Sequence, residues 1–95
     1  MPRRWALQQN VPNPFNPVTV IHYDVPTGAP LASLDIYDVA GRHVRNLLRG
    51  PLTPGKQSVQ WNGKDDRGGE VASGVYFYRL TAKSFQATRK MVLLR

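Results

Sequence analysis

Apolar and polar residues alternate along most of this chain. In residues 19–25, Thr19, Ile21, Tyr23 and Val25 share one face, and the residues between them share the other. A period of two is the pattern of a β-strand with one buried side. Shorter or longer runs of the same kind occupy residues 34–37, 43–48, 56–62, 74–80 and 85–94.

Helical spacing is not sustained anywhere, and glycines and prolines interrupt the pattern about every 8–12 residues. Together these features predict an all-β fold, an immunoglobulin or fibronectin III-like antiparallel β-sandwich of about seven strands. Gly74 to Leu80 is the most β-prone run and is expected to be a central strand. Trp61, Tyr76 and Tyr78 are expected in the core, and Gly41 is expected to close a tight turn with positive φ.

A proline-rich lead-in, residues 10–17, precedes the first strand. Its three prolines restrict φ to about −65° and remove three backbone donors, so the segment must be stiff and extended. We expect Phe15 to dock over one end of the sandwich, and the prolines to hold the linker away from the sheet edge. The structural residues of this motif are Asn13, Pro14, Phe15, Asn16 and Pro17.

The 95 residues carry 13 lysines and arginines against 6 acidic residues, a net charge of +7. These basic residues are dispersed, without a block of five, which argues against a nucleic-acid-binding arm. No nucleic-acid partner is therefore expected. The charge suits either an ordinary solvated surface or attraction to a polyanion such as an anionic glycan or lipopolysaccharide.

Candidate catalytic groups are sparse. The absence of cysteine excludes a disulfide scaffold, a thiolate zinc site and a cysteine nucleophile. His22 and His43 fall on different predicted strands without a third ligand or an orienting group, and no serine has a nucleophile-elbow context. We therefore expect no enzymatic activity, no cofactor and no metal centre.

The loop at residues 62–70 partly resembles a calcium-binding loop, because oxygen donors alternate with glycines. It lacks the EF-hand spacing, and Lys64 and Arg67 would place positive charge beside the cation. We favour a structural turn capped by Asn and Asp side chains, with calcium binding as the alternative.

No apolar run approaches the roughly 18 residues of a membrane span. The start at Met1 lacks the apolar region of a signal peptide, and we expect it to mark a cut from a longer protein. Residues 1–6 are assigned to a linker or a remnant of that protein, and residues 7–95 to one domain.

Six stretches in order carry a resemblance to a known family. They are LQQNVPNPFNP (7–17), TVIHY (19–23), IYDVAGR (36–42), WNGKD (61–65), SGVYFYRL (73–80) and TRKMVLLR (88–95). In this order they closely resemble the type A C-terminal sorting domains of the type IX (Por) secretion system. They also resemble the immunoglobulin-like domain of the flagellar hook-capping protein.

The resemblance implies a sorting domain at the C-terminus of a larger secreted protein, which crosses the outer membrane of a Gram-negative bacterium. The partners it implies are the secretion translocon and a sortase-like peptidase, which removes the domain while the cargo is joined to anionic lipopolysaccharide at the cell surface. Asn62 departs from the family, which often has aspartate after the tryptophan. This departure weakens the case for a carboxylate metal site there.

The closing pattern of the family, basic residues around short apolar ones, matches the end of the chain. We expect the secretion signal to be Lys90, Met91, Val92, Leu93, Leu94 and Arg95, in an accessible edge strand. Two alternatives stay open: a carbohydrate- or surface-adhesion module binding through Trp5 or tyrosines, and a flagellar hook-cap domain.

Overall fold

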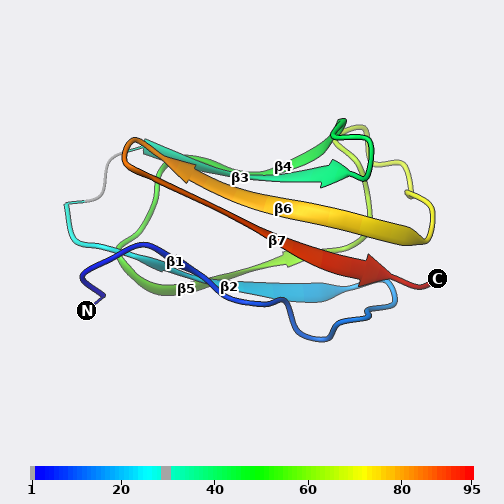
Figure 1. The fold of residues 1–95 in the computed structure, drawn as a ribbon, viewed down its shortest axis with the longest axis horizontal. Coiled ribbons are helices and arrows are strands. Elements are labelled where there is room, and N and C mark those ends of the chain that lie inside the picture. Colours follow the sequence, from blue (N-terminus) through cyan, green and yellow to red (C-terminus); the bar gives the residue numbers. More distant parts are fainter. Residues whose placement is uncertain (1, 29–30) are drawn as a thin grey trace.

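The computed structural model describes residues 2–28 and 31–95, and all of its regular elements are strands. Figure 1 shows these strands stacked in two layers. They are β1 (Ala6–Leu7), β2 (Thr19–Val25), β3 (Leu31–Asp38), β4 (His43–Pro51), β5 (Gly55–Trp61), β6 (Gly74–Ala82) and β7 (Phe85–Leu93). No helix in the described ranges is long and apolar enough to cross a membrane.

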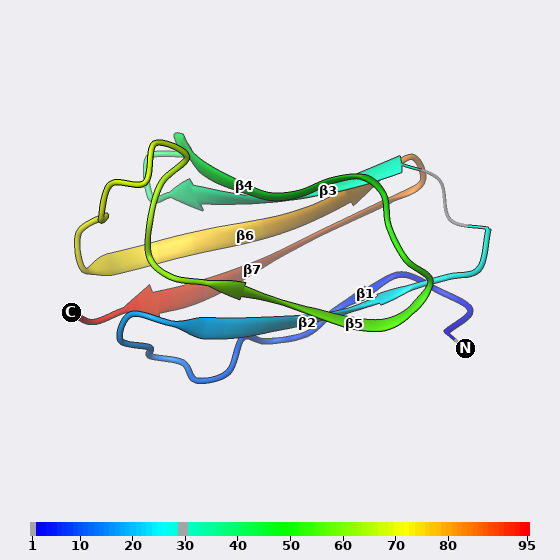
Figure 2. The same cartoon turned by 180° about the vertical axis from the view of Figure 1, so that it is seen from behind.

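The two layers are a three-stranded sheet, ordered β1-β2-β5, and a four-stranded sheet, ordered β4-β3-β6-β7. All pairings between these strands are antiparallel. The reverse view in Figure 2 shows β2 and β5 in one layer and β4, β3, β6 and β7 in the other. The predicted sandwich is confirmed, and β6 lies between β3 and β7, so it is an interior strand as expected.

The core lies between the layers and follows the period of two. Trp61 is 1% exposed, and its ring meets that of Tyr76 edge-on at 5.4 Å between centroids. Tyr76 and Tyr78 project inward from β6, as their spacing predicts. The largest fully buried side chains are Trp61, Tyr78, Phe15, Ile21, Leu34, Ile36, Leu80, Met91 and Leu93.

The turn between β3 and β4 is the one expected at Gly41, which has φ of 81°. Its N–H donates to the carbonyl of Asp38 at 3.0 Å. The Asp38 side chain accepts from the backbone N–H groups of Arg42 and Ala40, each at 2.9 Å. The Arg42 backbone bond, ahead of those from the Arg42 side chain and from Ala40, holds the pKa of Asp38 below its ordinary value.

Several strands begin or end up to three residues away from the predicted runs, and one strand was not predicted. For example, β4 continues to Pro51, beyond the run at residues 43–48, and β5 begins at Gly55, one residue before the run at residues 56–62. The short strand β1 was not predicted, since two residues show no periodicity. It pairs Ala6 with Asp24 and Leu7 with Tyr23 at the edge of the smaller sheet.

Candidate functional site: the terminal strand and the segment that covers it

The first four residues of the predicted secretion signal, residues 90–93, form the second half of β7 at the outer edge of the four-stranded sheet, and Leu94 and Arg95 follow the strand. Met91 and Leu93 are fully buried, whereas Leu94 is 53% exposed. Lys90 is also exposed. The six residues thus divide between core positions and solvent, as expected for the last strand of a sandwich.

The lead-in lies directly along this edge. Phe15 forms a parallel bridge with Leu93: its N–H donates to the Val92 carbonyl at 3.0 Å, and its own carbonyl accepts from Leu94 N–H at 2.9 Å. The Asn13 side-chain oxygen accepts from Val92 N–H at 2.9 Å. The prolines were expected to hold the linker away from the sheet edge, whereas the lead-in that contains them pairs with that edge. Phe15 keeps both of its backbone groups, and Asn13 supplies an acceptor, so the segment pairs between its prolines.

We call residues 9–17 the proline strap. Gln9 belongs to it because its side-chain amide donates to the Lys90 carbonyl at 2.7 Å. On its other side, Val11 forms an antiparallel bridge with Val20 of β2. The strap therefore connects the edges of the two sheets along the same side of the sandwich.

Buried groups fix the strap in place. The Phe15 ring is 2% exposed and packs against Trp61 at 5.7 Å between centroids. Asn10 is also buried, and its N–H donates to the Tyr78 hydroxyl at 2.8 Å. That hydroxyl donates to the Gln8 carbonyl at 2.6 Å. Burial raises the pKa of Tyr78 to about 12, so the hydroxyl stays protonated and can act as both donor and acceptor.

Arg95 is held by the loop that precedes β6. Its guanidinium donates to Val71 O at 2.6 Å, Gly63 O at 2.5 Å and a Glu70 carboxylate oxygen at 3.0 Å. Its backbone N–H donates to Ser73 Oγ at 2.9 Å. Only 25% of this side chain is exposed, so the basic residue at the end of the predicted signal is held in place by contacts within the domain.

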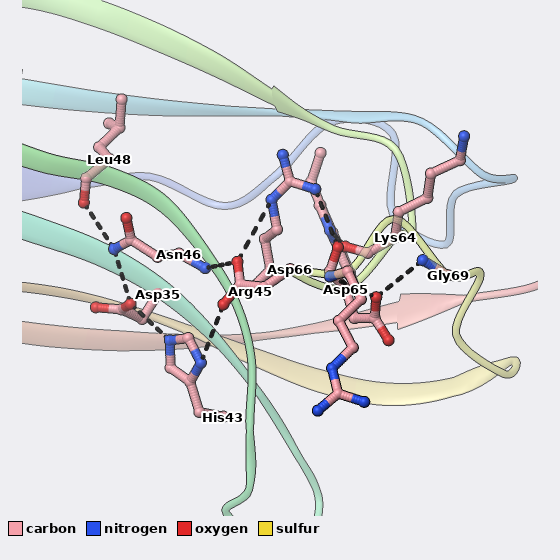
Figure 3. Close-up of polar contacts among 11 residues, drawn as sticks. Asp35, His43, Arg45, Asn46, Leu48, Lys64, Asp65, Asp66 and Gly69 are labelled. Atoms are coloured by element: carbon pink, nitrogen blue, oxygen red, sulfur yellow. Dashed lines mark hydrogen bonds and ion pairs between the residues drawn. The ribbon is translucent and has the colours of Figure 1, made fainter.

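A polar cluster joins β3, β4 and the loop after β5 (Figure 3). An oxygen of Asp35 lies 2.8 Å from His43 Nε2 and 2.9 Å from Asn46 Nδ2. Asp66 accepts from the Asn46 N–H at 2.9 Å, and its other oxygen lies 3.6 Å from His43 Nδ1. Burial alone would raise the pKa of Asp35, but the bonds from Asn46 and His43 outweigh it and lower that pKa.

In the loop at residues 62–70, a carboxylate stabilises the turn by accepting hydrogen bonds from the backbone. One Asp65 oxygen accepts from the N–H groups of Arg67 and Gly69 at 3.0 and 2.9 Å, which closes the turn. This agrees with the structural-turn interpretation. Over the described ranges, no three His, Asp or Glu side chains are grouped so that they could hold a metal ion.

The aromatic residues offered for carbohydrate binding are mostly occupied. Tyr23, Tyr76 and Tyr78 are all buried, and the Trp5 ring stacks on Phe85 at 6.2 Å between centroids. The half-buried Tyr37 has the Arg79 guanidinium over its ring at 5.0 Å. Tyr23, Tyr76 and Tyr78 therefore present no exposed ring to a sugar, whereas Trp5 and Tyr37 are half-buried.

Sequence reasoning did not find the residues that hold the signal in place. Gln9, Asn10, Gly63 and Glu70 have no local pattern that links them to β7. The polar Asn10 directly before Val11-Pro12 was the available hint, since a polar side chain inside a motif that docks needs partners.

Residues 15–86 match the family model described as the FlgD Ig-like domain. No curated protein matches the sequence.

Two solved structures share the fold. Dimeric latent PorU from Porphyromonas gingivalis is 21% identical with a TM-score of 0.74, covering 99% of this chain and 10% of that one. PorZ from the same organism, described as an essential surface component of the type-IX secretion system, is 24% identical with a TM-score of 0.63, covering 92% and 11%. The chain thus spans about a tenth of either protein. Because the family match extends over more than half of its residues, this chain belongs to the family of FlgD Ig-like domains.

Proposed function

We propose that this immunoglobulin-like domain is a non-catalytic C-terminal module that directs a larger protein through the type IX secretion system to the cell surface. The observation that carries the proposal is the position of β7: the strand that ends in the basic-apolar-basic pattern is the outermost strand of its sheet. The likeness to PorU and PorZ supports it, since both were described in a bacterium with this secretion system.

The proposed chemistry is strand recognition. An edge strand presents backbone donors and acceptors that a translocon can pair with, while the alternating side chains give specificity. In this proposal, the translocon and a sortase-like peptidase are the partners, and the cargo is left on anionic lipopolysaccharide at the outer membrane.

The test is a secreted reporter fused upstream of this domain in a bacterium that has the type IX system. Deleting residues 90–95 should leave the reporter in the periplasm, measured by surface labelling and cell fractionation. Continued surface display would contradict the proposal.

The deletion also removes the buried Met91 and Leu93, so a variant that preserves the core is needed. Lys90→Gln with Leu94→Ser changes only exposed side chains of the signal. The matched control, Lys56→Gln with Leu31→Ser, makes the same two changes at exposed positions on other strands. Only the first pair should reduce display.

A second candidate is a role in the flagellar hook cap, favoured by the family match itself. That match ends at residue 86, so a hook-cap role gives residues 90–95 no special task. The two functions therefore differ in the paired variants above: a hook-cap domain would tolerate both pairs equally.

A further inference from the structure

We propose that a partner strand pairs with the upstream half of the β7 outer edge, Gln86–Lys90, and that the proline strap sets the downstream limit of this docking surface. The inference rests on the proposed function for the source of the partner, an extended polypeptide segment of the secretion machinery. The residues after Lys90 then act by holding β7 in place.

Backbone direction along β7 follows from the strap contacts. Val92 N–H and Val92 C=O both bond to the strap, so both point away from β6. In an antiparallel ladder such outward residues recur at every second position. The register of β6 with β7 runs without a shift from Gly74–Leu93 to Ala82–Phe85. The backbone groups of Gln86, Thr88 and Lys90 therefore point to the same outer edge.

This edge is covered along only part of its length. Gln9 bonds the Lys90 carbonyl, Asn13 and Phe15 bond Val92, and Phe15 bonds Leu94. Across residues 2–28 and 31–95, no hydrogen bond from another segment reaches the backbone of Gln86 or Thr88. Near this stretch β1 contacts β7, and the Arg89 guanidinium donates to the Leu7 carbonyl, but that bond leaves the outward backbone groups of β7 unused. An added strand would therefore pair between Gln86 and the Lys90 N–H, upstream of the strap.

Side chains on this stretch indicate what kind of strand would fit. Gln86, Thr88 and Lys90 are exposed on the outer face of the sheet, and the Arg79 guanidinium donates to Thr88 Oγ1 at 3.2 Å. On the opposite face of β7, Phe85 and Ala87 are half-buried against the core. A strand alternating acidic or polar residues with apolar ones complements both faces.

Amide hydrogen exchange tests whether the edge is open. In the isolated domain, the amides of Thr88 and Lys90 should exchange at least about tenfold faster than those of Val92 and Leu94, which the strap protects. Equal protection of Thr88 and Val92 would overturn the inference, whatever the secretion assays show.

The reporter fusion tests whether the open edge is used. Thr88→Pro removes an outward N–H and blocks strand addition, while proline at such a position is compatible with an edge strand. Surface display should fall by about tenfold or more, because the partner strand loses one main-chain hydrogen bond and packs less well beside residue 88. Thr88→Ala, which keeps the backbone, is the control, and thermal unfolding verifies that both variants fold.

The outcomes separate the two proposals. If deletion of residues 90–95 blocks display but folded Thr88→Pro is displayed normally, the sorting function stands and the docking surface is wrong. If neither change affects display, both are wrong. Asn13→Ala, which uncovers Val92 N–H, should leave display intact and speed exchange at Val92; loss of display in this variant would also contradict the inference.

Discussion

The Arg95 guanidinium approaches the carbonyl oxygen of Gly63 to 2.5 Å, and a Cβ atom at Gly63 would lie only 2.7 Å from the same nitrogen. Gly63 also has φ of 72°. A Cβ atom at Gly63 would therefore require the guanidinium of Arg95, a residue 32 positions away along the chain, to move. This contact fixes the end of β7 to the loop that precedes β6.

Gly63→Ala is expected to destabilise the domain by about 2–4 kcal/mol, because backbone strain adds to displacement of Arg95. Urea unfolding measures the change. Gly68→Ala is the matched control, since Gly68 has φ of 84° but nothing within 4 Å of an added Cβ. It should show the strain alone, about 1–2 kcal/mol. Equal losses in the two variants would show that displacing the Arg95 guanidinium adds nothing to the loss of unfolding free energy.

Tyr78→Phe should loosen the strap. The hydroxyl accepts from Asn10 N–H and donates to the Gln8 carbonyl, so its removal leaves two groups of the strap region without their partner. We expect a loss of about 1–3 kcal/mol in unfolding free energy, together with faster amide exchange at Asn10 and Val92. Tyr76→Phe, which removes one bond to Ala72, is the control and should leave Val92 exchange unchanged.

Stability should fall in strongly basic solution. The folded pKa of Tyr78 is about 12 against an ordinary value of 10.0, so above pH 10 the unfolded chain releases its proton first. The stabilising contribution is complete below pH 10 and is lost as pH rises toward 12, by up to about 1.4 kcal/mol per pH unit for one such group. Burial also raises the pKa of Tyr23 and Tyr76, which add to the fall. In Tyr78→Phe, the unfolding free energy measured with urea should fall less steeply between pH 9 and pH 11 than in the native chain. An equally steep fall would exclude Tyr78 as a source of this pH dependence.

Asp35 should make the stability of the domain fall in acidic solution. Its folded pKa lies below the ordinary value of 3.8, so its contribution is present above that pH and is lost as pH falls through the folded pKa. Asp35→Asn replaces the charged acceptor of His43 and Asn46, and should cost about 1–3 kcal/mol at pH 7. The variant should also lose less stability than the native chain between pH 5 and pH 2. A parallel decline in both proteins would assign the acid sensitivity to other carboxylates.

The fold was predictable because its signals are local. Alternation in residues 19–25 locates β2 with its observed limits, and Trp61, Tyr76 and Tyr78 occupy the core positions expected from their spacing. Gly41 closes the predicted turn with positive φ. Such features need only neighbouring residues to be recognised.

The candidate site was predicted only in part. The resemblance implies that the last strand carries a secretion signal, and a signal that a translocon must reach is expected at a sheet edge. The structure places β7 at the edge of its sheet. The sequence predicted a stiff, extended lead-in with Phe15 docked on the sandwich, but it did not predict that this segment lies along β7. Neither Phe15 nor Asn13 has a local pattern that indicates its partner on β7, Val92, which is 79 positions from Asn13 in the sequence.

By itself, the sequence determined a sandwich of short strands with an aromatic core, a stiff lead-in and a basic-apolar-basic end. Only the tertiary structure decided that the lead-in covers the end of β7, and that Arg95 enters a seat beside Gly63. The physical reason is distance in the sequence, since Asn13 and Val92 are 79 positions apart. A local alternation of apolar and polar residues does not indicate which strand edges become neighbours when two sheets pack. That choice is made by the burial of Phe15 against Trp61, a contact which exists only in the folded domain.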